Sequence, residues 1–152
     1  MSDRWIILIP RDPHFIPDES SQEAAVAKFA EIAPRVLGIE AVNYDPVAFV
    51  DCGRDFETVW CPACGAQLYM DWWEETMESD FSEENGFQLK EYPTPCCGEP
   101  ATLNALSYEW PQGFARFALK ALDPDHDYLS GEEIEEFESI LKTPLMQILR
   151  CD

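Results

Sequence analysis

The chain has 152 residues and a formal net charge of −20, because thirty acidic residues stand against only ten basic ones. Its 46% hydrophobic and 12% aromatic content excludes a disordered acidic tail, which lacks the side chains that pack a core. The charge argues against direct binding to nucleic acid or an anionic membrane, since phosphate binding depends on Lys and Arg. A simpler explanation of the same charge is solubility alone.

The first third of the chain predicts strands around one helix. Residues 5–9 are a continuous apolar run and indicate a buried strand. After a proline-containing loop we expect a helix capped by Ser20 or Ser21, which ends or kinks just before Pro34. Its apolar stripe consists of Ala25, Phe29, Ile32 and Val36. Residues 39–44 and 46–51 indicate two further strand-like pieces.

The middle of the chain predicts an amphipathic helix flanked by strands at 56–60 and 87–92. Four large apolar residues recur at every fourth position and indicate one packed helical face: Tyr69, Trp73, Met77 and Phe81. The opposite face is acidic and carries Asp71, Glu74, Glu75 and Glu78.

The last third predicts two strands and a helix. Residues 103–110 and 114–122 indicate strands joined through the turn-forming residues 111–113, although the second is rich in Ala and Leu and is also compatible with a helix. Ser130 and Glu133 form a capping box for a final helix with a break near Thr143. Its apolar stripe consists of Ile134, Phe137, Leu141, Leu145 and Ile148. The chain is therefore predicted to be a single α+β domain over residues 1–152, with an antiparallel sheet.

Two pairs of cysteines carry the strongest chemical signal. Cys61 and Cys64 stand in Cys-Pro-Ala-Cys-Gly, and Cys96 and Cys97 stand in Pro-Cys-Cys-Gly. Two thiolate pairs separated by a long excursion are typical of a tetrahedral structural zinc site, and the glycine after each pair allows a tight turn. The second pair is irregular, because Thr94 occupies the position where a zinc knuckle has its first ligand. We take all four cysteines as the predicted metal ligands, and the alternatives are that one of the adjacent cysteines is a non-ligand or that the site is degenerate and free of metal.

These cysteines predict a zinc-ribbon-like hairpin over about residues 56–110, with the acidic helix inserted between its two halves. A catalytic zinc needs an open position and usually a histidine ligand, whereas His14 and His126 lie in polar surroundings far from the cysteines in sequence. We therefore expect no catalytic residues. A thiol-redox role remains an alternative, because Cys-x-x-Cys precedes a helix here. Cys52 and Cys151 are expected to be free thiols.

Two acidic runs without any Lys or Arg could form a partner surface. Residues 71–84 hold seven acidic side chains and residues 123–138 hold eight. If they share one face, their field would steer a basic protein toward it. The predicted contact residues are Trp72, Glu75, Glu78, Asp123, Asp125 and Asp127. Trp73, Trp110 and Phe114 are further candidate anchors, although core packing is the simpler role for at least two of the aromatic residues.

The segment after residue 122 imitates a calcium loop. Asp123, Asp125 and Asp127 match the first, third and fifth positions of an EF-hand. The sixth position is Tyr128 instead of glycine, and Glu133 falls one place short of the twelfth position. An acidic loop that leads into a helix N-terminus is the favoured interpretation.

The cysteine pairs and the string Trp110-Pro-Gln-Gly-Phe-Ala-Arg-Phe117 together resemble a family of small, acidic, largely uncharacterised bacterial proteins. The resemblance runs from about residue 50 to the final helix. It implies paired-cysteine positions at Cys61, Cys64, Cys96 and Cys97, and it implies no enzyme activity. In size and charge the chain is also similar to immunity proteins that block secreted nuclease toxins.

We therefore expect a non-catalytic, cytoplasmic binding protein with structural zinc, which neutralises a basic partner such as a nuclease toxin. The cytoplasm is expected because the thiols are clustered for metal and no export signal is recognisable. The alternatives are a thiol-redox or other enzyme that uses the cysteines, and a structural or regulatory zinc module.

Overall fold

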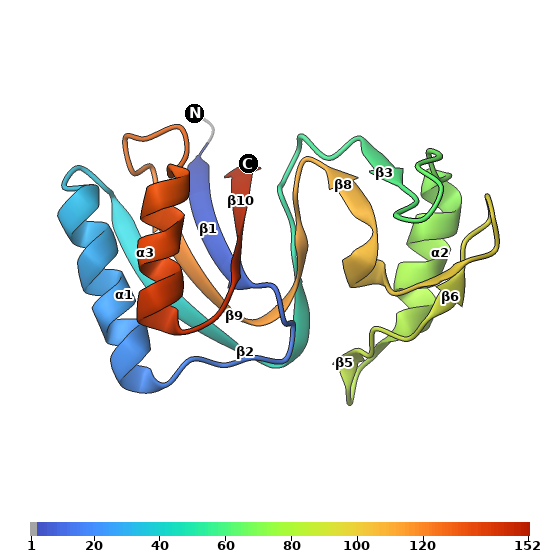
Figure 1. Cartoon of the computed structure of the whole chain (residues 1–152), viewed down its shortest axis with the longest axis horizontal. Coiled ribbons are helices and arrows are strands. Elements are labelled where there is room, and N and C mark those ends of the chain that lie inside the picture. The colour runs from blue at the N-terminus through green and yellow to red at the C-terminus, as the bar shows by residue number, and fades with distance from the viewer. Residues whose placement is uncertain (1–2) are drawn as a thin grey trace.

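The computed structural model describes residues 3–152, in which two helices cover one face of a four-stranded antiparallel sheet (Figure 1). This sheet body is built from β1 (Arg4–Pro10), α1 (Glu19–Ile32), β2 (Gly38–Val50), β9 (Gly113–Leu122), α3 (Gly131–Leu141) and β10 (Leu145–Cys151). The strand order is β10-β1-β9-β2. In the unit β1-α1-β2 the two strands are separated by β9, and in the unit β9-α3-β10 they are separated by β1. This arrangement is the split βαβ topology of ferredoxin-like folds.

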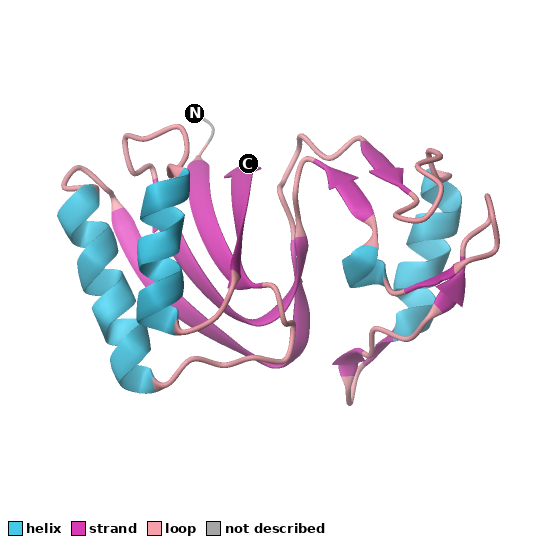
Figure 2. Ribbon diagram, in the orientation of Figure 1, coloured by secondary structure: helices cyan, strands magenta, loops and turns pink. Residues whose placement is uncertain are grey.

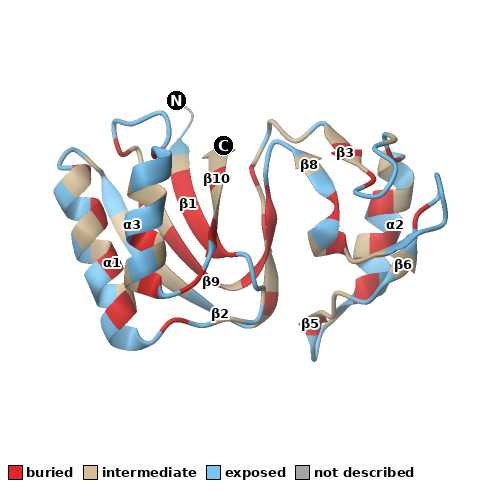
Figure 3. Ribbon diagram, viewed as in Figure 1, coloured by how far each residue is buried: buried red, intermediate tan, exposed pale blue. Residues whose placement is uncertain are grey.

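The central strands are buried on both faces, which explains their continuous apolar sequence. Ile6 and Leu8 of β1 pack toward the helices in a cluster that includes Phe29 and Phe137. Ile7 and Ile9 point to the other face, because successive side chains of a strand alternate. The buried residues accordingly follow β1 and β9 and the inner sides of both helices (Figure 3).

The first helix begins at Glu19, slightly before the position that Ser20 and Ser21 suggested. Its N-cap is Asp18, whose side chain accepts the N–H of Ser21, so the expected cap at Ser20 or Ser21 is wrong. An aspartate accepts this hydrogen bond as well as a serine does. The helix ends at Ile32, with Ala33 as C-cap, and thus stops before Pro34 as predicted.

The C-terminal segment corrects the predicted length of the last helix. The capping box of Ser130 and Glu133 is present, and α3 ends where Lys142 adopts a left-handed conformation with φ of 63°. Beyond it the chain forms β10 along the edge of β1 instead of more helix. Leu145 joins the core beneath the helices and Ile148 joins the opposite face. A spacing of three places two residues on the same side of a helix but on opposite sides of a strand.

Two other segments were ambiguous in the sequence and are strands. Residues 114–122 lie in β9, between β1 and β2, and are not helical. The two pieces expected at residues 39–44 and 46–51 belong to one strand, β2, which ends at Val50 and whose register shifts between Asn43 and Ala48. Pro46 lies in this irregular part of an edge strand, where its missing N–H breaks no ladder.

Residues 51–112 form an insertion between β2 and β9, here called the inserted module (Figure 2). Its elements are β3 (Thr58–Trp60), α2 (Met70–Asp80), β4 (Phe81–Ser82), β5 (Gly86–Phe87), β6 (Tyr92–Pro93), β7 (Pro100–Ala101), the 3-10 helix η1 (Leu103–Ala105) and β8 (Ser107–Glu109). The strands pair as β3–β8, β4–β5 and β6–β7. Strands β8 and β9 therefore do not pair with each other across residues 111–113. The predicted inserted helix is confirmed, whereas the strand expected at 87–92 is reduced to its two ends.

A second apolar cluster holds the inserted module on the ends of β2 and β9. Val59, Leu68, Trp73 and Leu103 of the module pack with Phe114 of β9. The indole N–H of Trp73 donates to the hydroxyl of Tyr108 at 3.1 Å, and that hydroxyl donates to the carbonyl of Leu103 at 2.6 Å. Trp73 and Phe114 are thus core residues, as the simpler interpretation of the aromatic residues predicted.

The predicted apolar stripe of α2 packs only through its middle. Trp73 is buried and Met77 lies against the same cluster, but the side chains at the two ends of the stripe are exposed. Tyr69 is 75% exposed and Phe81 is 49% exposed. The helix ends at Asp80, so Phe81 belongs to the following β4–β5 hairpin.

Candidate metal centre

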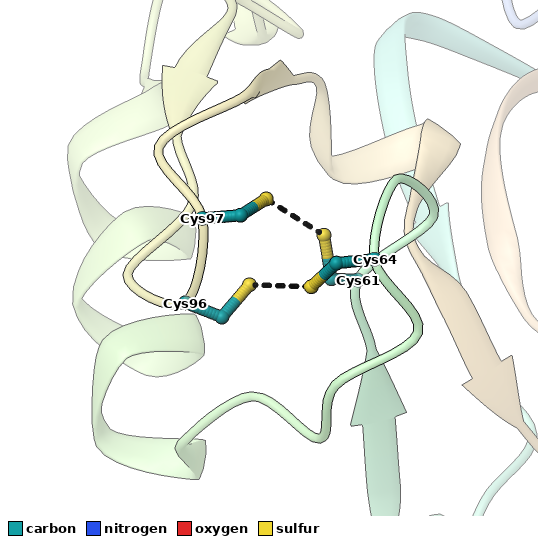
Figure 4. A group of neighbouring side chains, drawn as sticks. All are labelled: Cys61, Cys64, Cys96 and Cys97. Atoms are coloured by element: carbon teal, nitrogen blue, oxygen red, sulfur yellow. Dashed lines mark hydrogen bonds between the residues drawn. The ribbon is translucent and has the colours of Figure 1, made fainter.

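Two loops of the inserted module bring the four paired cysteines together. The first loop follows β3 and carries Cys61 and Cys64, and the second joins β6 to β7 and carries Cys96 and Cys97. Figure 4 shows the two loops facing each other with their sulfur atoms between them. All four sulfur atoms lie within 4.8 Å of one another. The structure therefore brings together the complete set of metal ligands predicted from the sequence.

Two of the distances between the sulfur atoms are close to the edge of a tetrahedral zinc site. Sγ of Cys61 lies 3.8 Å from Sγ of Cys97, and Sγ of Cys64 lies 3.4 Å from Sγ of Cys96. Zinc–sulfur bonds of about 2.3 Å place the sulfurs of a tetrahedron about 3.8 Å apart. All four cysteines are free thiols in this arrangement. The cluster can accept a thiophilic dication with small adjustments of its side chains.

Each cysteine loop is closed by a glycine in a conformation that other residues rarely adopt. Gly65 has φ of 77° and Gly98 has φ of 78°. An ideal Cβ at either glycine would meet nothing within 4 Å, so backbone conformation and not space is the constraint there. This confirms the predicted tight turn after each cysteine pair.

Backbone amides make the first loop favourable for a thiolate. The N–H groups of Cys64 and Ala63 lower the pKa of the Cys61 thiol to about 6. The amide of Ala66 acts in the same direction on Cys64, but the adjacent thiols and desolvation raise the pKa of that group to about 12. Hydrogen bonds with the neighbouring thiols, together with desolvation, thus oppose the loss of the proton from Cys64. A bound dication would remove this conflict and allow the remaining thiols to ionise.

The cluster lies at the surface of the module. Cys61 is buried with 2% exposure, whereas Cys64, Cys96 and Cys97 are exposed. Thr94 of the second loop is buried at 3% exposure and contacts the sulfurs from the protein side. A metal held here would fasten two loops at the tip of the module while staying close to solvent.

Asp80 is a buried organising residue that the sequence analysis missed, because it appeared as one more member of an acidic run. Its side chain is fully buried and accepts the N–H groups of Leu89 and Lys90 at 2.7 and 3.0 Å. It also accepts the hydroxyl of Tyr92 at 2.8 Å, and together with burial it raises the pKa of Tyr92 to about 12. Asp80 thereby shapes the segment that leads into the second cysteine loop. Leu89, at φ of 53°, is part of this turn.

The two acidic runs predicted as a partner surface lie at opposite ends of the molecule's long axis (Figure 1). Glu75 and Glu78 are exposed on α2 of the inserted module, and the neighbouring Trp72 is partly buried. Asp125 and Asp127 are exposed in the loop between β9 and α3 of the sheet body. The fold therefore does not place the two runs on one face, and the six predicted contact residues do not form one surface.

The acidic loop of the sheet body is already engaged by basic residues. Asp125 lies 3.3 Å from the guanidinium of Arg35, and Asp127 lies 3.6 Å from that of Arg4. The carboxylate of Asp123 accepts the backbone N–H of Arg4 at 3.0 Å. The three carboxylates thus serve different partners and do not converge on one point, which agrees with an acidic loop more than with a calcium loop.

The remaining polar candidates lie apart from the cysteine loops. His14 is exposed in the loop between β1 and α1, and exposed His126 lies 3.1 Å from the carbonyl of Ile32. Cys52 is a buried free thiol and Cys151 a partly buried one. Trp110, a candidate anchor, is 52% exposed.

The chain matches no protein-family model, and comparison with curated proteins and with solved structures found no match. The resemblance of its cysteine pattern to a bacterial family therefore stays a prediction. Among residues 3–152, no helix combines the length and the apolar character needed to cross a bilayer.

Proposed function

We propose that the chain is a non-catalytic binding protein whose inserted module is fastened by one structural zinc ion and presents an acidic surface to a basic protein. The observation that supports the metal is that the sulfur atoms of four cysteines from two separate loops lie within 4.8 Å of one another: Cys61, Cys64, Cys96 and Cys97. Four thiolates close the coordination sphere of zinc, as in sites that stabilise a fold without chemistry. Cys61 and Cys64 follow β3, and Cys96 and Cys97 lie in the β6–β7 hairpin, so a metal bound by all four would cross-link these two parts of the module.

The unequal distribution of charge supports a basic partner at α2. Residues 51–112 contain thirteen acidic residues and two basic ones, Arg54 and Lys90. Within the part of the chain that the structure describes, the ion pairs found involve none of the acidic residues of α2. An uncompensated acidic helix beside partly buried Trp72 offers both long-range attraction and an apolar contact. We take Trp72, Glu75 and Glu78 as the centre of this surface.

A secreted nuclease toxin is the specific partner that we propose. A nuclease attracts polyanions to its basic site, and a folded acidic surface can compete for that site. This part of the proposal depends on charge alone. An immunity role in the cytoplasm would follow from it.

Elemental analysis of protein purified without added metal tests the zinc. The expected result is one zinc per chain, and a chelator should lower the melting temperature because metal binding and folding are coupled. Absence of metal, with the four thiols of the cluster titrating freely, would contradict the structural site. Such a result would favour the thiol-redox alternative, because Cys61-Pro-Ala-Cys64 is then a free Cys-x-x-Cys pair ahead of α2.

Capture of partners from the native bacterium, with identification by mass spectrometry, tests the binding role. We expect a basic protein whose association slows as salt shortens the Debye length from about 10 Å at 0.1 M to about 3 Å at 1 M. Glu75→Lys with Glu78→Lys on α2 should slow association strongly. The matched control is Glu132→Lys with Glu135→Lys, which reverses two exposed charges of the same spacing on α3. Equal effects of the two pairs, or binding insensitive to salt, would contradict the proposed surface.

A further inference from the structure

The two cysteine loops have the same backbone hydrogen bonds. In the first loop the N–H of Cys61 donates to the carbonyl of Ala66 at 2.8 Å, and the N–H of Gly65 donates to the carbonyl of Cys61 at 2.9 Å. In the second loop the N–H of Thr94 donates to Glu99 at 3.1 Å, and the N–H of Gly98 donates to Thr94 at 2.9 Å. The glycines also share nearly the same positive φ.

This repetition defines which residues of the two loops are equivalent. Thr94 takes the place of Cys61, and Cys97 takes the place of Cys64. Cys96 then corresponds to Ala63, the third position of the loop, which carries no ligand in the first loop. The backbone alone therefore assigns Thr94 and Cys97, and not Cys96, to the two ligand positions of the second loop.

Thr94 occupies the first ligand position of the second loop, but its neutral hydroxyl is not a group that binds structural zinc. Its Oγ1 is 3.4 Å from Sγ of Cys97 and 3.9 Å from Sγ of Cys61, close to the edge of about 3.8 Å of a zinc–sulfur tetrahedron. Its hydroxyl donates to the carbonyl of Glu99 at 3.1 Å, which keeps the proton on the oxygen. Protein zinc ligands are thiolates, imidazoles and carboxylates, so a protonated hydroxyl leaves one corner of the site unfilled.

We infer that Cys96 supplies the fourth ligand from the third position of its loop and replaces the ligand that Thr94 does not provide. Its sulfur lies 3.4 Å from that of Cys64 and belongs to the group within 4.8 Å. The adjacent pair is thus neither degenerate nor half used, because Cys96 and Cys97 hold different corners of the same site. This inference rests on the proposed zinc site.

The equivalence of the loops has a direct consequence for redesign. A cysteine in place of Thr94 would set its sulfur near the position of Oγ1, at tetrahedral distance from Cys61 and Cys97. Thr94→Cys combined with Cys96→Ala should therefore convert the second loop into a regular Cys-x-x-Cys knuckle. The converted site should bind zinc with a dissociation constant within tenfold of the original, whereas Cys96→Ala alone should weaken binding at least 100-fold, since even outer-shell changes cost about 10- to 100-fold.

X-ray absorption at the zinc edge of the full, unmodified chain tests the inference without relying on a variant that folds. Four sulfurs at about 2.3 Å are expected. Three sulfurs and one oxygen would overturn the role of Cys96, although a zinc ion would still cross-link the two loops. A chain that binds no zinc would instead refute the proposed function itself.

Cobalt(II) titration then assigns the fourth sulfur to a residue. The sulfur-to-cobalt charge-transfer absorption scales with the number of thiolates, so Cys96→Ala should lose about a quarter of it and the double variant should recover it. Cys151→Ser, which removes a thiol outside the cluster, is the control and should leave the spectrum unchanged. Full absorption in Cys96→Ala, or three-thiolate absorption in the double variant, would overturn the inference.

Discussion

The sheet body and the inserted module are stabilised in different ways. The body has strands of 7 to 13 residues, and its cores contain fully buried side chains such as Phe29, Phe117 and Phe137. The module has strands of two or three residues, and polar or thiol contacts surround Asp80 and the four cysteines. An isolated two-stranded hairpin is marginally stable at best, so short hairpins need a cross-link or a buried anchor.

The two acidic regions also differ in their ion pairs. Carboxylates of the body pair with arginines and lysines, for example Asp125 with Arg35 and Glu136 with Lys28 at 2.8 Å. The α2 carboxylates have no such ion pair among the described residues, and Asp80 is directed inward to bind backbone amides. If Asp80 and the cysteine cluster stabilise the module, the exposed carboxylates of α2 are not needed for its stability.

The largest expected effect is loss of the module when the metal site is removed. Structural zinc sites contribute on the order of 10 kcal/mol to folding, which exceeds what two-residue strands can supply. Cys61→Ser or chelation should remove hydrogen-exchange protection from β3, α2 and β8 while β1, β9 and β10 keep theirs. Mass spectrometry of exchanged peptides measures this. Unchanged protection in the module would show that it folds without metal, and loss in both regions would show that they fold as one unit.

Truncation of the body core should come next. Phe117 is fully buried against the helices, so Phe117→Ala should cost about 3–5 kcal/mol of unfolding free energy. The matched control is Phe81→Ala, the same truncation at a half-exposed position of the module, with an expected cost of about 1 kcal/mol or less. Denaturant titration compares the two. Similar losses would contradict the difference in packing between the regions.

Removal of the buried carboxylate should weaken the module alone. Asp80→Ala leaves three donors without an acceptor, at a cost of about 3 kcal/mol because hydrogen bonds to charged groups are worth about 1.5–3 kcal/mol each and are not additive. Tyr92→Phe removes one donor and should cost about 1 kcal/mol. Exchange protection of residues 88–92, with zinc bound, measures both effects. Equal effects of the two variants would mean that the backbone amides do not depend on Asp80.

The smallest expected effect is a loss of module stability at alkaline pH. Burial and the hydrogen bond to Asp80 raise the pKa of Tyr92 from 10 to about 12. The folded state thus prefers the protonated phenol, so its contribution is complete below pH 10 and is lost as pH rises toward 12. Melting temperatures of the chain and of Tyr92→Phe should converge over this interval. A constant difference between them would contradict the raised pKa.

Local sequence patterns were sufficient where one residue or one short motif decides the structure. The capping box of Ser130 and Glu133, the end of α1 before Pro34 and the turns at Gly65 and Gly98 were all predicted, because each depends on nearby backbone geometry. Each cysteine pair was recognised for the same reason, and the presence of a second pair predicted that the two pairs share one metal site.

Local patterns were not sufficient where the same pattern is compatible with two kinds of secondary structure or with two environments. The spacing of Leu145 and Ile148 suits a helix, yet hydrogen bonding to the free edge of β1 makes this segment a strand. Asp80 and Glu78 look alike in the sequence, but only Asp80 meets the amides of residues 89 and 90 and becomes buried. The contact made with a distant segment, and not the residue type, sets these outcomes.

The sequence by itself determined an acidic α+β chain with an inserted helix, its principal turns and caps, and two cysteine pairs with the spacing of one metal site, because these follow from composition and from residues a few positions apart. Only the tertiary structure decided the strand order β10-β1-β9-β2, the separation of the two acidic runs and the burial of Asp80. Each of these depends on segments that are distant along the chain. Burial and hydrogen bonding select among their possible pairings only when the whole chain has folded.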